Sequence, residues 1–256
     1  MADPSLLAVF AHPDDESLAA GGLLARQAAA GGLARVVTAT WAADSSRSRE
    51  LAAALRVLGA GRPRMLGYAD ARVPESAPGC ARLIDTPLDE AVGRLVAHVR
   101  ELRPDLVVTH DAYGGLTGHP DHVHTHRITM LAVEAAGLEL LYPESGPPWR
   151  PREVWLATHP RSALPALREI VGAVKAAYTM PDDEVTLRLD VGPWLEQKVA
   201  AVLAHASEVA RGALPGLVAG LSPAARTALL GTEWYVRSGP RTPLTGEATG
   251  GDVGAA

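Results

Sequence analysis

Short apolar runs alternate with helical segments through the first two-thirds of the chain, and this alternation is the strongest constraint on its fold. The runs are rich in Val, Leu, Ala and Thr, as buried strands are. Strands are expected at 6–11, 34–41, 64–68, 105–110 and 153–158. Helices are expected between them, at 17–30, 49–58, 88–102 and 121–136. Strands that alternate with helices form βαβ units, so the pattern predicts an α/β fold with a doubly wound, mostly parallel sheet and helices on both faces.

The last third of the chain departs from that alternation. Residues 185–191 alternate apolar and polar side chains, which is typical of an edge or antiparallel strand. A helix is expected at 193–211 and a late strand at 232–237. We therefore expect a smaller mixed C-terminal part, joined to the parallel sheet in a single domain over residues 1–238. The remaining segment, 239–256, is rich in Gly, Pro and Thr, which predicts a disordered tail.

Charge, hydropathy and cysteine content exclude several classes of protein. A formal net charge of −5 gives no overall basic field, so nucleic acid is not an expected partner. No stretch approaches the roughly 18 apolar residues of a transmembrane helix, and no basic signal segment opens the chain, so no membrane partner is expected. Cys80 is the single cysteine, which rules out an intramolecular disulfide and fits a reducing, cytoplasmic location. Phosphate-loop, CxxC and GxSxG motifs are absent from the sequence.

Two short clusters of histidine and acidic residues carry the chemistry of this sequence. The first is AHPDDE at 11–16, and the second is GHPDHVHTH at 118–126. Each cluster follows a predicted strand, which places both at the strand ends where open α/β sheets bind their ligands. Histidines and carboxylates drawn from two such loops form metal sites that keep an open coordination position. The sequence therefore predicts a metal-dependent site between the two clusters.

Spacing within the clusters selects the candidate ligands. His12 and Asp15 are three residues apart, so both can face one side of the first turn of a helix. His119 and His126 lie three and four residues from His122, so His122 belongs to both pairings and is the best candidate of its cluster. Two simpler interpretations stay open at this point. The acidic residues of the first cluster can serve as helix caps, and the histidines of the second can form a solvated helix face.

Together, AHPDDE at 11–16 and HPDH at 119–122 resemble the paired motifs of the PIG-L / LmbE-like N-acetylglucosaminyl deacetylase family. That family includes the mycothiol-pathway deacetylase and the mycothiol conjugate amidase. The resemblance extends over most of the first 210 residues, with further matches at 49–51 and 103–105. It implies a Rossmann-like fold, in agreement with the alternation of strands and helices, and a metal-dependent hydrolase that removes an acyl group from a sugar amine.

The resemblance also implies roles for the residues of the first motif and for one histidine of the second. The family's metal ligands correspond to His12, Asp15 and His122, and its general base corresponds to Asp14. Two neutral imidazoles and one carboxylate leave Zn²⁺ with room for water and a substrate oxygen. The implied cofactor is therefore Zn²⁺, although Fe²⁺ would serve the same ligands.

Four further residues receive roles from the same resemblance. His119 corresponds to the second catalytic histidine, which as an imidazolium would stabilise the oxyanion or protonate the departing amine. Asp121 resembles the acidic residue that orients neighbouring groups. Arg47 and Asp70 stand where family members place sugar-binding residues; as alternatives, Arg47 is a solvated residue at a helix start and Asp70 a turn former.

The substrate is expected to be an amino sugar of low molecular weight. The resemblance favours N-deacetylation of an N-acetylglucosamine-containing molecule, such as a mycothiol-type pseudodisaccharide or a glycosylated secondary-metabolite precursor. One alternative is an amidase that uses the same site to cleave a larger acyl group, such as that of a mycothiol S-conjugate. An alternative of another class is a non-catalytic protein that binds sugar or metal. The carboxylate Asp14 argues for catalysis, because a binding module needs no base beside its metal.

Overall fold

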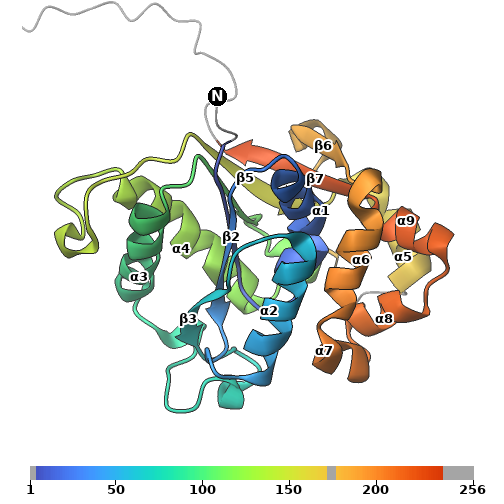
Figure 1. The fold of residues 1–256 in the computed structure, drawn as a ribbon, viewed down its shortest axis with the longest axis horizontal. Helices are drawn as coiled ribbons and strands as arrows, with labels where there is room; N and C mark the ends of the chain where they lie inside the picture. The colour runs from blue at the N-terminus through green and yellow to red at the C-terminus, as the bar shows by residue number, and fades with distance from the viewer. Residues whose placement is uncertain (1–3, 172–176, 239–256) are drawn as a thin grey trace, which may run out of the picture.

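The computed structural model describes residues 4–171 and 177–238, and a seven-stranded sheet lies at its centre (Figure 1). The strands are β1 (Leu6–Phe10), β2 (Ala34–Thr40), β3 (Arg64–Tyr68), β4 (Leu106–His110), β5 (Glu153–Thr158), β6 (Leu187–Asp190) and β7 (Thr232–Ser238). Their order across the sheet is β3-β2-β1-β4-β5-β7-β6. Neighbours from β3 to β5 are parallel, whereas β7 is antiparallel to both β5 and β6. The predicted mostly parallel sheet is confirmed, and β6 is the expected antiparallel edge strand.

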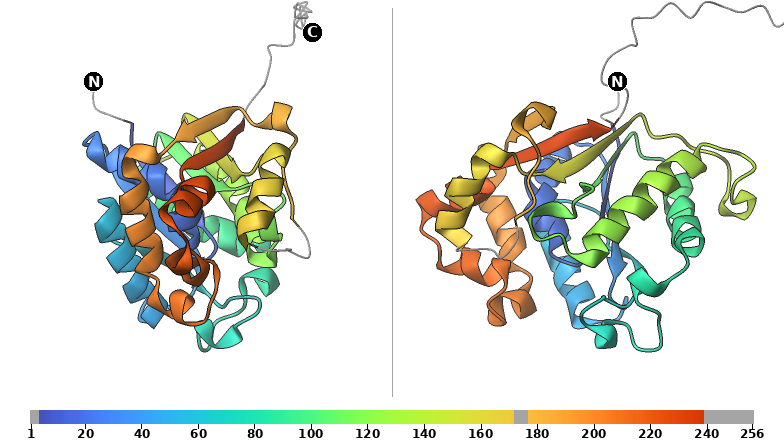
Figure 2. Two further views of the ribbon diagram at one scale, coloured as in Figure 1. Left: turned by 90° about the vertical axis from the view of Figure 1, so that its right-hand side faces the viewer. Right: turned by 180° about the vertical axis from the view of Figure 1, so that it is seen from behind.

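Helices cover both faces of the sheet, as the two further views also show (Figure 2). They are α1 (Asp15–Ala29), α2 (Ser46–Leu58), α3 (Leu88–Leu102), α4 (Pro120–Ala136), α5 (Leu164–Val171), α6 (Leu195–Leu203), α7 (Ala206–Ala210), α8 (Leu214–Gly220) and α9 (Pro223–Leu230). Alternate side chains of β1 point to opposite faces of the sheet and pack against the helices on each face. Leu6, Ala8 and Phe10 pack with α1 and α2, whereas Leu7 and Val9 pack with α3 and α4. Burial on both faces explains why this strand is a continuous apolar run.

Local sequence signals set the ends of the helices that border the parallel sheet. The side chain of Ser45 caps α2 by accepting the backbone N–H of Ser48. Gly59 ends the same helix at a φ of 73°, a left-handed conformation that glycine adopts without strain. Pro120 occupies the first turn of α4, where its missing N–H costs no hydrogen bond. These signals account for the close agreement between predicted and observed boundaries in this part of the chain.

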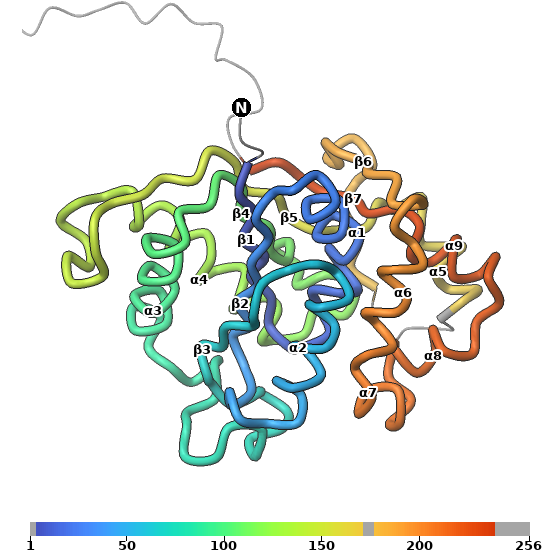
Figure 3. Tube along the Cα trace, viewed as in Figure 1, coloured from blue at the N-terminus to red at the C-terminus, as the bar shows by residue number. Residues whose placement is uncertain are grey.

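The C-terminal part differs from the sequence prediction. The single helix expected at 193–211 is wrong: the helical path breaks between α6 and α7, where His205 has a ψ of 67°. The His205 ring is fully buried against Glu16, and this tertiary contact replaces helical continuity. Three short helices, α5, α8 and α9, were not predicted, and they pack with α6 around a separate apolar cluster. In the tube view, the orange helix α6 stands beside α1, and α8 and α9 lie on the far side of α6 (Figure 3).

The strand order places the two sequence clusters together. The chain runs outward from β1 through β2 to β3, then returns to β4 on the other side of β1. The ends of β1 and β4 therefore lie at the point where the strand order reverses, which is where open α/β sheets form their binding crevice. Across the described ranges, none of the helices is both long and apolar enough to cross a bilayer. The predicted tail at 239–256 lies outside the described residues.

Candidate active site

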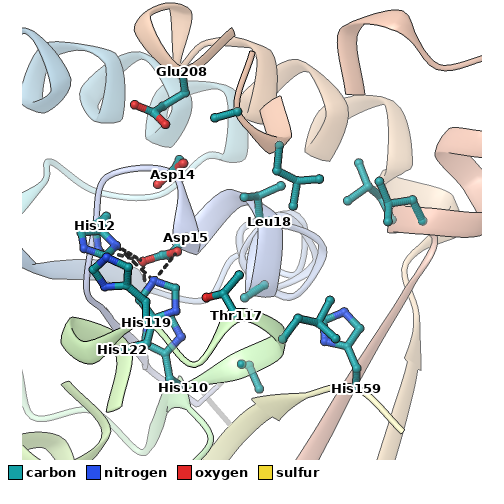
Figure 4. Close-up of a pocket in the computed structure, with 18 of the residues that line it drawn as sticks. His12, Asp14, Asp15, Leu18, His110, Thr117, His119, His122, His159 and Glu208 are labelled. Atoms are coloured by element: carbon teal, nitrogen blue, oxygen red, sulfur yellow. Dashed lines mark hydrogen bonds and ion pairs between the residues drawn. The ribbon is translucent and has the colours of Figure 1, made fainter. Parts of the chain in front are cut away.

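Two loops at the ends of β1 and β4 bring the histidine and acidic clusters into contact (Figure 4). His12 and Asp14 lie in the short connection between β1 and α1, and Asp15 is the first residue of α1. His119 is the N-cap of α4 and His122 lies in its first turn. The parallel pairing of β1 with β4 fixes the distance between the two loops. The sequence separation of about a hundred residues is thus closed by one strand pair.

The side chains of His12, Asp15 and His122 form a triangle, called here the donor triangle, in which each imidazole faces a different oxygen of Asp15. His12 Nδ1 lies 3.1 Å from His122 Nε2 and 3.3 Å from Asp15 Oδ2. His122 Nε2 lies 3.3 Å from Asp15 Oδ1. Ligands about 2.0–2.1 Å from one tetrahedral ion are separated by roughly 3.3 Å, so these spacings match a shared metal. Three overlapping groups of the described residues could hold an ion. They are His12 with His119 and His122, Asp15 with His110 and His122, and His12 with Asp70, His119 and Asp121.

Two carboxylates hold the far side of the His12 ring. His12 Nε2 lies 3.1 Å from Asp121 Oδ2 and 3.2 Å from Asp70 Oδ2. A proton on Nε2 can be donated to either carboxylate, which leaves Nδ1 free to face an ion, the usual arrangement behind a metal-binding histidine. Burial opposes a charge on His12, but hydrogen bonds to Asp121, Asp15 and Asp70 hold its pKa well above the ordinary value. Burial would raise the pKa of Asp70, yet the His12 contacts hold it below its usual range.

The protonation states of the other two donors suit a metal. Burial favours a neutral Asp15, but the surrounding histidines His122, His110 and His12 hold its pKa well below the ordinary value. Burial also lowers the pKa of His122 well below its ordinary value, against the attraction of Asp15. Asp15 is therefore ionised and His122 neutral near pH 7. These are the states from which a carboxylate and an imidazole bind a cation.

Asp14 sits in a strained backbone position beside the donor triangle. Its φ of 136° is a conformation that favours glycine, and the Glu16 carboxylate holds it by accepting its backbone N–H at 3.0 Å. Its Oδ1 lies 2.9 Å from Nη2 of Arg47. Burial and the charge of Asp15 raise the pKa of Asp14 to about 7, against the lowering effect of Arg47. A carboxyl group tuned to this range is suited to accept a proton at physiological pH.

His119 presents its Nε2 toward the site because its Nδ1 is already engaged. The backbone N–H of Asp121 donates to His119 Nδ1 at 3.2 Å, so a neutral ring carries its proton on Nε2. Burial and the nearby charge of His12 lower the pKa of His119 to about 4. Near pH 7 this geometry favours a neutral Nε2–H donor rather than the imidazolium expected from the sequence.

Arg47 and Asp70 both lie beside the donor triangle, and Arg47 is not the solvated residue of the alternative interpretation. Arg47 is buried, and its guanidinium bridges Asp14 and Glu208, with 3.0 Å between Nη1 and Glu208 Oε1. Asp70 is buried against His12, although its other oxygen also accepts the backbone N–H of Arg72 as a turn former would. Both side chains line the same cavity as the donor triangle.

The sequence analysis did not identify two residues that contact this network, Glu208 and His110. Glu208 lies on α7, outside any motif, and no local signal identifies it. His110 ends β4, where it stacks on His122 with ring centroids 4.1 Å apart and accepts the backbone N–H of Ala11. A polar residue at the end of a strand that precedes a histidine cluster was the available signal for His110.

A cavity of about 370 Å³ opens from the donor triangle, a size in the range of small-molecule sites. Every residue that the sequence placed in the site lines it except Asp121, which is fully buried behind His12. The alternative of a solvated histidine face does not hold for His119 and His122, because both rings turn into this cavity rather than toward bulk solvent.

Comparisons with known proteins find a matching family and similar structures. Residues 7–133 match the model of the family described as GlcNAc-PI de-N-acetylase. The 1D-myo-inositol 2-acetamido-2-deoxy-alpha-D-glucopyranoside deacetylase of Rhodococcus jostii is 36% identical over 244 aligned residues, covering 82% of this chain and 83% of that protein. A conserved protein of Thermus thermophilus has a similar structure, with a TM-score of 0.67, 26% identity, and coverage of 93% of this chain and 96% of that one. The N,N'-diacetylchitobiose deacetylase of Pyrococcus horikoshii shares the fold, with a TM-score of 0.66, 19% identity, and coverage of 94% and 88%.

Proposed function

The chain belongs to the GlcNAc-PI de-N-acetylase family, and from this premise we propose that it is a zinc-dependent deacetylase of an N-acetylglucosamine-containing small molecule. A mycothiol-type pseudodisaccharide, the glycoside named for the Rhodococcus relative, is the leading substrate. The observation that carries the proposal is the donor triangle with Asp14 beside it: three ligand side chains with donor atoms 3.1–3.3 Å apart, next to a carboxyl group whose pKa is about 7.

The residues present fit a divalent metal. His12, Asp15 and His122 would hold it, with spacings that suit Zn²⁺ and equally Fe²⁺; Asp15 and His122 are also in the protonation states that bind a cation, whereas His12 would lose a proton on binding. When bound, zinc polarises the amide carbonyl and lowers the pKa of water. Asp121 and Asp70 fix the orientation of His12 through its Nε2, so the ligand is preorganised.

The side chains around the donor triangle divide the proton transfers between them. Asp14 accepts a proton from the attacking water, because its carboxylate lies beside the ligands and its pKa is near 7. His119 donates a hydrogen bond from Nε2 to the oxygen that gains charge as the carbonyl is attacked. The proton held on Asp14 then passes to the departing amine. Arg47 keeps Asp14 in place and limits the rise of its pKa.

Acetate release from a panel of N-acetylglucosamine conjugates, with metal-stripped and zinc-reloaded protein, tests the proposal. Zinc should restore release, and the preferred conjugate should contain an inositol or a similar polyol aglycone. Metal binding without hydrolysis of any conjugate would instead support a sugar- or metal-binding protein. Acetate release by the metal-stripped protein at the rate of the zinc-reloaded protein would reject the metal requirement.

Two variants with a matched control test the roles of individual residues. Asp14→Asn should keep the metal and lose roughly a hundredfold or more in kcat, the range typical of a general base. His122→Ala should lose bound metal. His124→Ala is the control: it lies on the same helix but does not line the cavity, so it should keep both metal and activity. Full metal occupancy in His122→Ala would reject the ligand assignment.

A further inference from the structure

We propose that this cavity contains an apolar arm that binds the acyl group of the substrate and favours aliphatic acyl chains longer than acetyl. The inference rests on the proposed deacylation at the donor triangle and names the substrate class of that site. The arm is the part of the cavity lined by Leu18, Leu116, Leu214, Leu229, Leu230 and Trp234.

The arm starts at the donor triangle and leads away from Asp14. In the close-up, His12, Asp14 and Asp15 lie at one end of the cavity and His159 lies at the other (Figure 4). Leu18 and Thr117 lie between the two ends. Leu18 is on the first turn of α1, three residues after Asp15, so the apolar wall begins directly beside a proposed ligand. A group bonded to the reacting carbonyl can therefore enter the arm.

Several leucines that line the arm are left only partly covered. Leu18, Leu116 and Leu214 are half-buried, although all three pack against the apolar cluster formed by α5, α6, α8 and α9. Leu229 and Leu230, which belong to the buried part of that cluster, also reach the cavity. An apolar cleft that remains open in a core forfeits packing contacts, and an aliphatic ligand restores them.

The charged groups in the wall of the arm are paired, and the one unpartnered polar atom that His159 contributes, its Nδ1, belongs to a ring with a lowered pKa. Lys198 Nζ lies 2.7 Å from Glu233 Oε1, and both side chains are almost fully buried. The Thr158 hydroxyl donates to the carboxylate of Asp111 at 2.6 Å. Burial lowers the pKa of His159 to about 4, so its ring is neutral near pH 7. These groups leave no free charge to attract the hydroxyl-rich part of a sugar into the arm.

The side of the donor triangle opposite the arm is charged and polar rather than apolar. Asp70, Arg72, Glu208 and Arg211 line the cavity there, grouped around His12, Asp14 and Arg47. Charged and hydrogen-bonding side chains of this kind suit the hydroxyl groups of a sugar. An amide carbon held at the donor triangle joins two groups, one on each side. The polar side takes the sugar amine, so the acyl group occupies the apolar arm.

The length of the acyl chain should therefore control the rate. Each methylene that leaves water for the arm should raise kcat/KM by about fourfold, until the arm is filled. The experiment measures kcat/KM of the zinc-loaded full chain for glucosamine carrying acetyl, butanoyl, hexanoyl or octanoyl on its nitrogen. Binding of the matching free carboxylates, from acetate to octanoate, is measured in parallel by calorimetry, because these products are not turned over.

Two tryptophan variants of the same helix supply the matched pair. Leu214→Trp narrows the arm and should lower the ratio of hexanoyl to acetyl kcat/KM by tenfold or more. Leu217→Trp introduces the same side chain one turn along α8 at a half-buried residue that does not line the cavity. That variant should keep the wild-type ratio. Equal ratios in both variants would overturn the arm as the acyl site.

The outcomes separate the arm from the proposed reaction. Hydrolysis of the acetyl substrate, with no gain in rate or carboxylate affinity for longer chains, would overturn the arm and leave the deacetylase intact. Carboxylate binding that tightens with length and weakens in Leu214→Trp, without hydrolysis of any substrate, would support the arm and reject the reaction. If no substrate is hydrolysed and carboxylate binding does not tighten with chain length, both the deacetylase and the apolar arm would be overturned.

Discussion

Replacement of Arg47 by methionine should shift the pH dependence of the reaction. The guanidinium lies 2.9 Å from Asp14 and is buried, so little solvent screens the pair. Arg47 opposes the effects of burial and of Asp15, which together raise the pKa of Asp14. Methionine keeps much of the length and apolar volume of the arginine stem and removes only the charge and its hydrogen bonds.

An opposite charge at this distance usually lowers the pKa of a carboxyl group by about one to three units, so its loss should raise the pKa of Asp14 by a similar amount. Glu208 would lose Arg47 and keep only Arg211 as its cationic partner, so its charge would act in the same direction. Because ionised Asp14 is the active base, kcat/KM rises with pH through its pKa, and a higher pKa moves that rise to higher pH. A cation bound at the donor triangle would lower the pKa of Asp14 in both the wild type and Arg47→Met, so the difference in pKa between the two proteins should remain.

The assay is a profile of kcat/KM against pH for the wild type, Arg47→Met and Arg49→Met, each with its zinc content measured. On the acidic limb, Arg47→Met should lose about tenfold for each pH unit of the displacement. Arg49 is exposed on the same helix and only donates to a backbone carbonyl, so its variant should retain the wild-type profile. An acidic limb of Arg47→Met that coincides with that of the wild type would refute the assignment of Asp14 as the titrating base.

Three further substitutions test the packing that supports the site, each by urea unfolding. Lys198→Met leaves Glu233 buried without its cationic partner and should destabilise the fold by about 3–5 kcal/mol; a loss below about 1 kcal/mol would show that the pair is not buried in solution. Arg100→Met removes a buried guanidinium that donates to six backbone carbonyls between Ala135 and Gly146, and should cost about 3 kcal/mol. Gly22→Ala drives a methyl group into Val191 and should cost about 1–3 kcal/mol, whereas Gly220→Ala meets open space and should not; similar losses in both would contradict the close packing of α1.

The agreement between sequence and structure is uneven for physical reasons. Apolar runs such as β1 and caps such as Ser45 and Gly59 act through neighbours in the chain, so the parallel sheet was predictable. The break at His205 was not, because it depends on a contact with Glu16, 189 residues away. The helices α8 and α9 are too short to be stable alone, although Ser222 caps α9, and a shared apolar cluster holds them in place.

For the site, the sequence alone supplied the chemistry: the spacing of His12, Asp15 and His122, and their position after predicted strands. Tertiary structure decided the electrostatics. Burial beside Arg47 tunes Asp14, and Glu208 joins the network from a helix that no motif marks. The apolar arm also arises only when α8 and α9 fold back beside α1. The types and spacing of residues in the sequence identify the candidate metal ligands. The pKa values and the cavity shape depend on the side chains that lie within a few ångströms, and only the folded chain brings those side chains together.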